Sequence, residues 1–342
     1  MTSRARLPAG KLPPDALGTL LARLSDPDPQ LLIPPAAGED AAVLDVGGGR
    51  CLVLTTDPIT FATDRIGWYA VHVNANDVAT LGAAPRWFMA VLLLPLGQAT
   101  TDLADTIFED IRLTSSALGV SVIGGHTEVT SGIDRPLVIG QMIGEVERSR
   151  LVVKRSLEPG DVVLLTRGAA IEGTAILARE RRQRLEALVP AALLDRAARL
   201  LFDPGISIVP AARIAADLGV VRAMHDPTEG GIVGGLAELA GAADVGLDVE
   251  VRAIPVLPET RALCDALALD PLRLVASGAL LAGVPSTHAS RLLDAWSAAG
   301  IAATRVAVVT APGQGAVLTD GAVRRPLVAP ERDELARFFE AG

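Results

Sequence analysis

Four short segments in the first half of the chain place carboxylates beside glycines or at strand ends. They are Gly38-Glu39-Asp40-Ala41-Ala42, Thr55-Thr56-Asp57-Pro58, Asn74-Ala75-Asn76-Asp77 and Gly124-Gly125-His126-Thr127-Glu128. Acidic groups gathered from several elements repel one another unless a cation lies between them, and Mg²⁺ takes carboxylate and phosphate oxygens as ligands. Together the segments predict a metal–nucleotide site at strand ends and loops. Taken singly, each aspartate is more often a turn former or a helix cap.

The second half contributes one further segment, His225-Asp226-Pro227-Thr228-Glu229-Gly230-Gly231, which leads into an apolar helix. A purely structural interpretation makes Asp226 the N-cap, Pro227 the first helical residue and Glu229 the end of a capping box. That interpretation leaves the glycines at 230, 231, 234 and 235 unexplained, since each weakens a helix by about 1 kcal/mol relative to alanine. Approach of a phosphate, or of another backbone segment, to the helix start would explain them.

The apolar periodicity predicts an α+β protein. Helices are expected at 17–24, 66–81, 102–118, 174–188, 191–201, 208–218, 231–240, 257–267 and 288–299. Strands are expected at 41–44, 51–55, 89–94, 120–123, 137–146, 162–166, 246–251, 275–281 and 304–309, with Gly47-Gly48-Gly49 joining the first two as a hairpin. A charged, irregular stretch near residue 150 predicts two domains, 1–147 and 155–342.

Composition excludes several classes of protein. The 342 residues carry 31 basic and 40 acidic side chains, so the net charge of 31 − 40 = −9 argues against a nucleic-acid partner. The sequence shows no signal peptide and no uninterrupted apolar stretch of membrane-spanning length, so we expect a cytoplasmic protein. Cys51 and Cys264 are the two cysteines and are expected to be buried and structural. Lys11 and Lys154 are the two lysines, a scarcity that composition alone assigns to a bias towards arginine.

The motifs occur in an order that resembles the aminoimidazole ribonucleotide synthetase-related, or PurM-like, superfamily. This superfamily includes selenophosphate synthetase, thiamine-monophosphate kinase and the hydrogenase-maturation dehydratase HypE. The resemblance runs from about Gly38 to Leu281 and includes the Pro159-Gly160-Asp161 entry to the second half. The segments His225-Asp226-Pro227-Thr228 and Ala276-Ser277-Gly278-Ala279-Leu280-Leu281 most resemble the HypE branch.

The resemblance implies a two-domain α+β fold, a homodimer formed through the N-terminal domain, and ATP with Mg²⁺ in a groove between the domains. It implies that an acceptor oxygen of a carbonyl, amide or phosphate is activated by phosphoryl transfer. The metal ligands it implies are Asp40, Asp57, Asp77 and Asp226, and the catalytic residues Asp57, Asp77, His126 and Asp226. The implied nucleotide contacts are Glu39, Asp40, Asn76, Gly124, Gly125, Thr127, Glu128, Thr228, Gly230 and Gly231.

Two departures from the HypE pattern leave the reaction open. HypE proteins end in a cysteine that accepts the carbamoyl group, whereas this sequence reads Arg337-Phe338-Phe339-Glu340-Ala341-Gly342. His126 stands where HypE carries aspartate; either Glu128 supplies the charge or His126 contacts phosphate as a cation. The alternatives are a HypE-related enzyme, a small-molecule kinase of the thiamine-monophosphate type, and a non-catalytic nucleotide-binding partner. The sequence assigns no role to Lys11.

Overall fold

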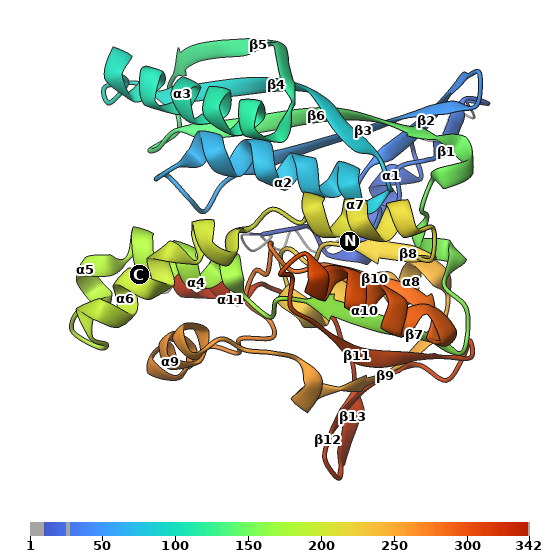
Figure 1. The fold of residues 1–342 in the computed structure, drawn as a ribbon. Coiled ribbons are helices and arrows are strands. Elements are labelled where there is room, and N and C mark those ends of the chain that lie inside the picture. Colours follow the sequence, from blue (N-terminus) through green and yellow to red (C-terminus); the bar gives the residue numbers. More distant parts are fainter. Residues whose placement is uncertain (1–9, 25–27, 341–342) are drawn as a thin grey trace, which may run out of the picture.

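Two sheets, one from each half of the chain, organise the protein (Figure 1). The computed structural model describes residues 10–24 and 28–340, so the expected domain ends at 1–9 and 341–342 lie outside the described residues. The first sheet has the strand order β1-β2-β3-β6-β4-β5, and only its β4–β5 pair is parallel. Its strands are β1 (Leu31–Ile33), β2 (Ala42–Gly47), β3 (Arg50–Ile59), β4 (Ala84–Pro95), β5 (Ser121–Thr130) and β6 (Leu137–Glu147).

Three helices accompany this sheet: α1 (Pro14–Leu21), α2 (Ile66–Thr80) and α3 (Thr101–Leu118). The bounds of α3 follow local chemistry, because Thr100 Oγ1 accepts the Leu103 amide and Gly119 ends the helix in a left-handed conformation. Helix α2 lies between the first sheet and the second half of the chain (Figure 1), so it is buried on nearly every side. This position brings the end of α2 that carries Asn76 and Asp77 against residues of both halves.

The second sheet has the order β13-β12-β9-β11-β7-β10-β8. Its strands are β7 (Asp161–Thr166), β8 (Ala223–His225), β9 (Gly246–Glu250), β10 (Leu281–Pro285), β11 (Ala303–Thr310), β12 (Ala316–Asp320) and β13 (Val323–Pro326). Its helices are α4 (Ile171–Glu180), α5 (Arg182–Leu185), α6 (Ala191–Arg199), α7 (Val209–Leu218), α8 (Gly231–Ala243), α9 (Pro258–Leu267), α10 (Ala289–Ala298) and α11 (Glu334–Glu340). Two short 3-10 turns, Arg148–Arg150 and Lys154–Ser156, lie in the connection between the two sheets.

The apolar core does not divide at this connection. One cluster of buried side chains joins residues of the first sheet and α2 to residues of α4, α6, α9 and α11. Asn76 adds a polar link, because its Nδ2 donates to Ile206 O at 2.8 Å and its Oδ1 accepts the Ile208 amide at 2.9 Å. Packing and hydrogen bonds therefore hold the two halves in one arrangement.

The α+β class, the 47–49 hairpin and the helices expected at 66–81, 102–118 and 208–218 are confirmed. Four expectations are wrong. The helix expected at 174–188 is divided into α4 and α5. Residues 124–128 lie inside β5 rather than in a turn after it, and the strand expected at 275–281 begins only at Leu281. Helix α8 begins at Gly231, so Asp226 is not its N-cap. Among the described residues, no helix is long and apolar enough to cross a membrane.

Candidate nucleotide and metal site

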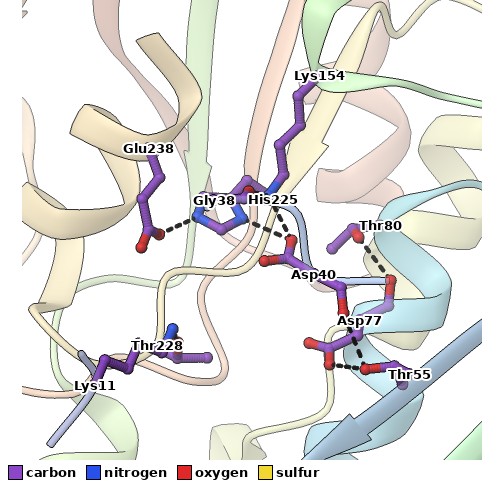
Figure 2. A network of polar contacts seen from close by, with 10 residues as sticks. All are labelled: Lys11, Gly38, Asp40, Thr55, Asp77, Thr80, Lys154, His225, Thr228 and Glu238. Carbon is purple, nitrogen blue, oxygen red and sulfur yellow. Dashed lines mark hydrogen bonds and ion pairs between the residues drawn. The ribbon is translucent and has the colours of Figure 1, made fainter. Parts of the chain in front are cut away.

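A buried ion pair joins the connection between the sheets to the segment before β2. Lys154 Nζ lies 2.7 Å from Asp40 Oδ2 and also donates to Gly38 O at 2.5 Å. The Lys154 side chain is 2% exposed, so these two partners compensate the cost of removing its charge from water. Figure 2 shows the side chain reaching towards Asp40 and Gly38. Burial alone would raise the pKa of Asp40, but Lys154 and His225 hold that pKa well below its ordinary value. Asp40 is therefore a fixed anion.

His225 bridges two carboxylates. Its Nδ1 lies 2.9 Å from Asp40 Oδ2 and its Nε2 lies 2.8 Å from Glu238 Oε2. Figure 2 marks both contacts with dashed lines. Burial and Lys154 lower the pKa of His225, but the two carboxylates outweigh them and raise it to about 9. Both nitrogens then donate, which makes His225 an imidazolium that positions Asp40. One ligand atom each of Asp40, His225 and Asp226 lie within 4.8 Å of one another, yet His225 keeps no free nitrogen for a metal.

Asp226 is a buried carboxylate without a partner. It is 1% exposed, and neither of its oxygens accepts a hydrogen bond from any described residue. Burial and the neighbouring Asp40 raise the pKa of Asp226 to about 8. Buried polar groups are nearly always satisfied, so a bare carboxylate at this position indicates that a cation or ligand completes it.

Asp57 and Asp77 complete the acidic cluster from the first half. Asp77 Oδ2 accepts from Thr55 Oγ1 at 2.7 Å, and Asp77 is 4% exposed. Burial and the carboxylates of Asp57 and Asp226 raise the pKa of Asp77 well above its ordinary value. Asn74 Oδ1 accepts the Asp57 amide at 3.0 Å and so fixes the backbone at this point of β3. The structure thus brings Asp40, Asp57, Asp77 and Asp226 together from both halves.

These carboxylates fit Mg²⁺, the ion expected from the sequence. Asp226 is unpartnered, and the pKa of Asp77 is raised by burial and by the neighbouring carboxylates, whose repulsion a cation relieves. Asp57, Asp77 and Asp226 are the residues that could hold such an ion. Asp40 has two cationic partners already, which makes it the least dependent of the four on a metal.

Sequence reasoning missed both lysines and Glu238. Lys11 Nζ donates to Thr228 Oγ1 at 3.0 Å, and the Lys11 amide donates to Glu229 Oε2 at 2.9 Å. Desolvation lowers the pKa of Lys11, but the carboxylates of Glu238, Asp40, Glu229 and Asp57 raise it above its ordinary value. The composition was the one sign in the sequence that could have drawn attention to the lysines. Of the 31 basic residues 29 are arginine, and both lysines lie at this site.

An apolar pocket adjoins the acidic cluster. Its volume is about 470 Å³. Its walls come from α1, the segment before β2, and strands β3, β4 and β6, and include Leu17, Glu39, Asp40, Thr56 and Gln141. Ligand pockets of this size commonly combine apolar walls with a few polar groups. Glu39, which the sequence predicts as a nucleotide contact, is one of the residues that line this pocket.

The structure does not bring the β5 residues to this cluster. Asp57 pairs with Gly140, Gly140 with Ala90, and Ala90 with Gly125, so Gly125 lies three strands away. At ~4.8 Å per strand this separation is about 14 Å. Residues 121–129 are all exposed, and His126 Nε2 lies 3.2 Å from Glu128 Oε2. Gly124, Gly125, His126, Thr127 and Glu128 therefore form a separate, exposed patch in the described chain.

Three expected nucleotide contacts have their polar atoms already engaged. Asn76 is fully buried, and both polar atoms of its side-chain amide are hydrogen-bonded to the backbone of Ile206 and Ile208. The Gly230 amide donates to Asp333 Oδ2 at 2.7 Å, and the Gly231 amide donates to Thr228 O. A Cβ on Gly231 would lie 2.6 Å from Leu272 O, so backbone rather than phosphate approaches the start of α8 there. In this arrangement these residues position the site and do not present free donors.

Comparisons with known proteins identify the family of this chain. The N-terminal domain model of AIR synthase related proteins matches residues 38–146, and the C-terminal domain model matches residues 158–320. The carbamoyl dehydratase HypE of Azotobacter vinelandii is 33% identical over 266 residues, covering 76% of this chain and 74% of that protein. HypE of Rhizobium leguminosarum is 31% identical over 76% of this chain and 73% of its own length.

Solved structures share the fold. The crystal structure of Escherichia coli HypE matches with a TM-score of 0.74 at 24% identity, over 95% of this chain and 99% of that one. A HypE structure in complex with ATP has a TM-score of 0.68 at 25% identity, over 87% and 90% of the two chains. The two family models together span most of this chain, which therefore belongs to the AIR synthase related, or PurM-like, family and is similar in it to the HypE proteins.

Proposed function

We propose that this protein is an ATP- and Mg²⁺-dependent enzyme that activates an oxygen of a small carbonyl, amide or phosphate compound by phosphoryl transfer. The observation that carries this proposal is Asp226, a buried carboxylate without a partner beside Asp40, Asp57 and Asp77. A HypE relative solved with ATP and relatives named carbamoyl dehydratases support the class of reaction.

The residues of the site divide into carboxylates and cations. Bound Mg²⁺ would supply charge neutralisation for the phosphates, and Asp57, Asp77 and Asp226 would hold it. Lys11 places a positive charge beside Thr228, where it would offset negative charge on the transferred group. Lys154 and His225 keep Asp40 anionic and in place. The acceptor oxygen forms a bond to the γ-phosphorus, the bond from that phosphorus to the bridging oxygen breaks, and ADP leaves with the electron pair.

A small-molecule kinase is the second candidate function, and the two cysteines favour it. Cys51 and Cys264 are 0% and 1% exposed, and burial raises the pKa of the Cys264 thiol to about 12. Neither thiol is therefore a ready acceptor in the described structure, and transfer to a free small molecule requires none. A thiamine-monophosphate kinase complexed with AMPPCP and TMP shares the fold, with a TM-score of 0.70 at 17% identity.

Thermal unfolding and calorimetry with ATP test the proposal. We expect ATP with Mg²⁺ to stabilise the wild type and EDTA to remove that gain, because ligands that bind the folded state raise its melting temperature. Asp57→Asn should abolish the gain, whereas the matched control Asp134→Asn, on an exposed loop, should retain it. ADP release stimulated by a phosphorylated acceptor favours the kinase. Binding without any turnover favours the non-catalytic partner, and no metal-dependent binding contradicts all three.

We also propose that two copies associate through β5. This edge strand exposes Val122, Ile123 and Val129, and unpaired edges with apolar side chains favour pairing with another chain. A partner copy there would cover the exposed residues 124–128. Sedimentation velocity should show a dimer that Ile123→Glu dissociates and that Leu188→Glu, at another exposed position, leaves intact. A monomeric wild type would contradict this proposal without affecting the ATP test.

A further inference from the structure

A second hollow lies between α2, α3 and the irregular turn Leu201–Gly205. Its volume is about 410 Å³, and it shares no residue with the pocket beside Asp40. The residues around it are Arg65, Trp68, His72, Leu113, Thr114, Ala117 and Phe202. None of these residues belongs to the acidic cluster, so the nucleotide site leaves this hollow unexplained.

Aromatic rings form its walls. The Trp68 and Phe202 ring centroids lie 5.2 Å apart with planes at 72°, and the Trp68 and His72 centroids lie 4.2 Å apart at 61°. Phe202 is 45% exposed although it packs against Trp68. Rings at such angles present both faces and edges to a guest, and flat aromatic groups gain about 0.5–1.5 kcal/mol per ring contact beyond their buried area.

Two of the residues that line the hollow carry polar atoms without partners. His72 Nδ1 and Thr114 Oγ1 are buried and make no hydrogen bond to any described residue, and the two residues are 8% and 3% exposed. Leaving a buried donor or acceptor unpaired costs about 1–3 kcal/mol, so a ligand that pairs with these atoms recovers part of that cost. Burial lowers the pKa of His72 to about 4, which keeps the ring neutral at pH 7.

The charges around the hollow cancel. Arg65 Nη2 lies 2.8 Å from Asp110 Oδ1, and the guanidinium of Arg65 also lies 5.4 Å from the Phe202 ring centroid. The other walls, Leu113 and Ala117, are apolar. Asp110 already neutralises the charge of Arg65, although Arg65 Nε itself has no hydrogen-bond partner among the described residues. A neutral guest would pair with the unpartnered atoms of the lining without disturbing the Arg65–Asp110 pair.

We propose that the hollow bounded by Trp68, His72, Thr114 and Phe202 binds a small, uncharged, planar heteroaromatic compound. Its ring would stack against Trp68 and Phe202, and its ring nitrogen or amide would pair with the His72 and Thr114 side chains. The site lies on the same helix as Asn76 and Asp77 but on residues that the nucleotide site does not use, so both ligands can be bound together.

Nicotinamide is a suitable probe, because it is planar and neutral and carries both a ring nitrogen and an amide. Titration is followed by tryptophan fluorescence in a Trp87→Phe background, which leaves Trp68 and the fully buried Trp296. We expect saturable quenching that saturating ATP with Mg²⁺ does not displace. Thr114→Val should weaken binding about five- to tenfold through loss of one hydrogen bond, and Thr114→Ser should restore it. Phe202→Ala should weaken binding further, while Leu188→Ala serves as a control that leaves it unchanged.

Three results would overturn the inference. The first is no saturable quenching by nicotinamide, adenine or uracil at millimolar concentrations. The second is equal affinity for cyclohexanecarboxamide, which carries the amide without a flat ring. The third is displacement of the probe by ATP, which would place it in the nucleotide pocket. Circular dichroism and the melting temperature of each variant distinguish lost binding from lost folding, and Thr114→Val is close to isosteric, so the fold should persist.

Discussion

The ammonium of Lys154 lies 2.7 Å from the Asp40 carboxylate, although the two residues are 114 positions apart in the chain, and the lysine side chain is almost fully buried. This pair joins the connection between the two sheets to the strand entry that carries the first acidic motif. Because Asp40 also accepts from His225, one carboxylate links three segments of the chain. The pair therefore couples the integrity of the fold to the geometry of the site.

Removing the Lys154 charge should destabilise the protein strongly. Lys154→Met leaves Asp40 with one cation fewer in a buried place, and breaking such pairs typically costs 3–5 kcal/mol, so we expect a loss of about 3 kcal/mol in urea unfolding. Lys154→Arg should not restore the loss, because a planar guanidinium does not fit a site built for a compact ammonium. The exposed Arg252–Asp320 pair is the control, and Arg252→Met should change little. An equal loss of unfolding free energy in Lys154→Met and Arg252→Met would contradict the claim that burial makes the Lys154–Asp40 pair important for stability.

Asn76 should behave as a structural residue rather than a nucleotide contact. Asn76→Ala leaves the Ile206 carbonyl and the Ile208 amide unpaired, and we expect the unfolding free energy to fall by about 2–3 kcal/mol. Hydrogen exchange at residues 206–208 should accelerate in parallel. Gln98→Ala removes an exposed hydrogen bond and should have a much smaller effect. Loss of ATP affinity with unchanged stability and exchange would restore the original interpretation.

Glu172 should make stability depend on pH. It is 6% exposed, and burial raises its pKa to about 7 although Ser277 donates to it, with Asp333 and Glu229 adding repulsion. In the folded state Glu172 keeps its proton up to about pH 7, whereas in the unfolded state it releases the proton near pH 4.5. The proton therefore stabilises the folded state fully below pH 4.5, and this stabilisation is lost as the pH rises through 7.

Glu172→Gln stays neutral and should not show this loss. At pH 8 the free energy of unfolding of the variant should exceed that of the wild type by at most about 3 kcal/mol, and at pH 4 the two free energies should agree. Glu186→Gln, at an exposed position, is the matched control. Unfolding free energies measured by urea at both pH values decide the point, and parallel curves for wild type and Glu172→Gln would refute it.

Two adjacent glycines of β5 should differ sharply in how well they tolerate substitution by alanine. A Cβ on Gly125 would lie 2.1 Å from Ala90 O, whereas a Cβ on Gly124 meets nothing within 4 Å. Gly125→Ala should therefore separate β5 from β4 and lower the melting temperature, while Gly124→Ala should leave it nearly unchanged. A matched pair of melting curves tests this, and equal tolerance of both substitutions would show that β5 lies differently against β4.

The local chemistry of the sequence determined a large part of this protein. Thr100 begins α3 and Gly119 ends it, and three glycines form the hairpin between β2 and β3. The order of the acidic motifs identifies the family. These features succeed because caps, tight turns and motif order depend on residues that are close in the chain. The resemblance to that family implied that Asp40, Asp57, Asp77 and Asp226 form one metal site, and each of them lies in a motif that can be recognised locally.

Only the tertiary structure decided which other residues surround those aspartates. Lys154 and Asp333 reach the site or its border across more than one hundred residues, and Glu238 reaches it from α8. No local motif of the sequence predicts these three contacts. Asp226 looked like a helix cap by its neighbours, but α8 begins five residues later, which leaves its carboxylate bare. Strand pairing, in turn, carried His126 and Glu128 to an exposed edge. Burial and long-range pairing depend on the whole chain at once, and they convert separate motifs into a site.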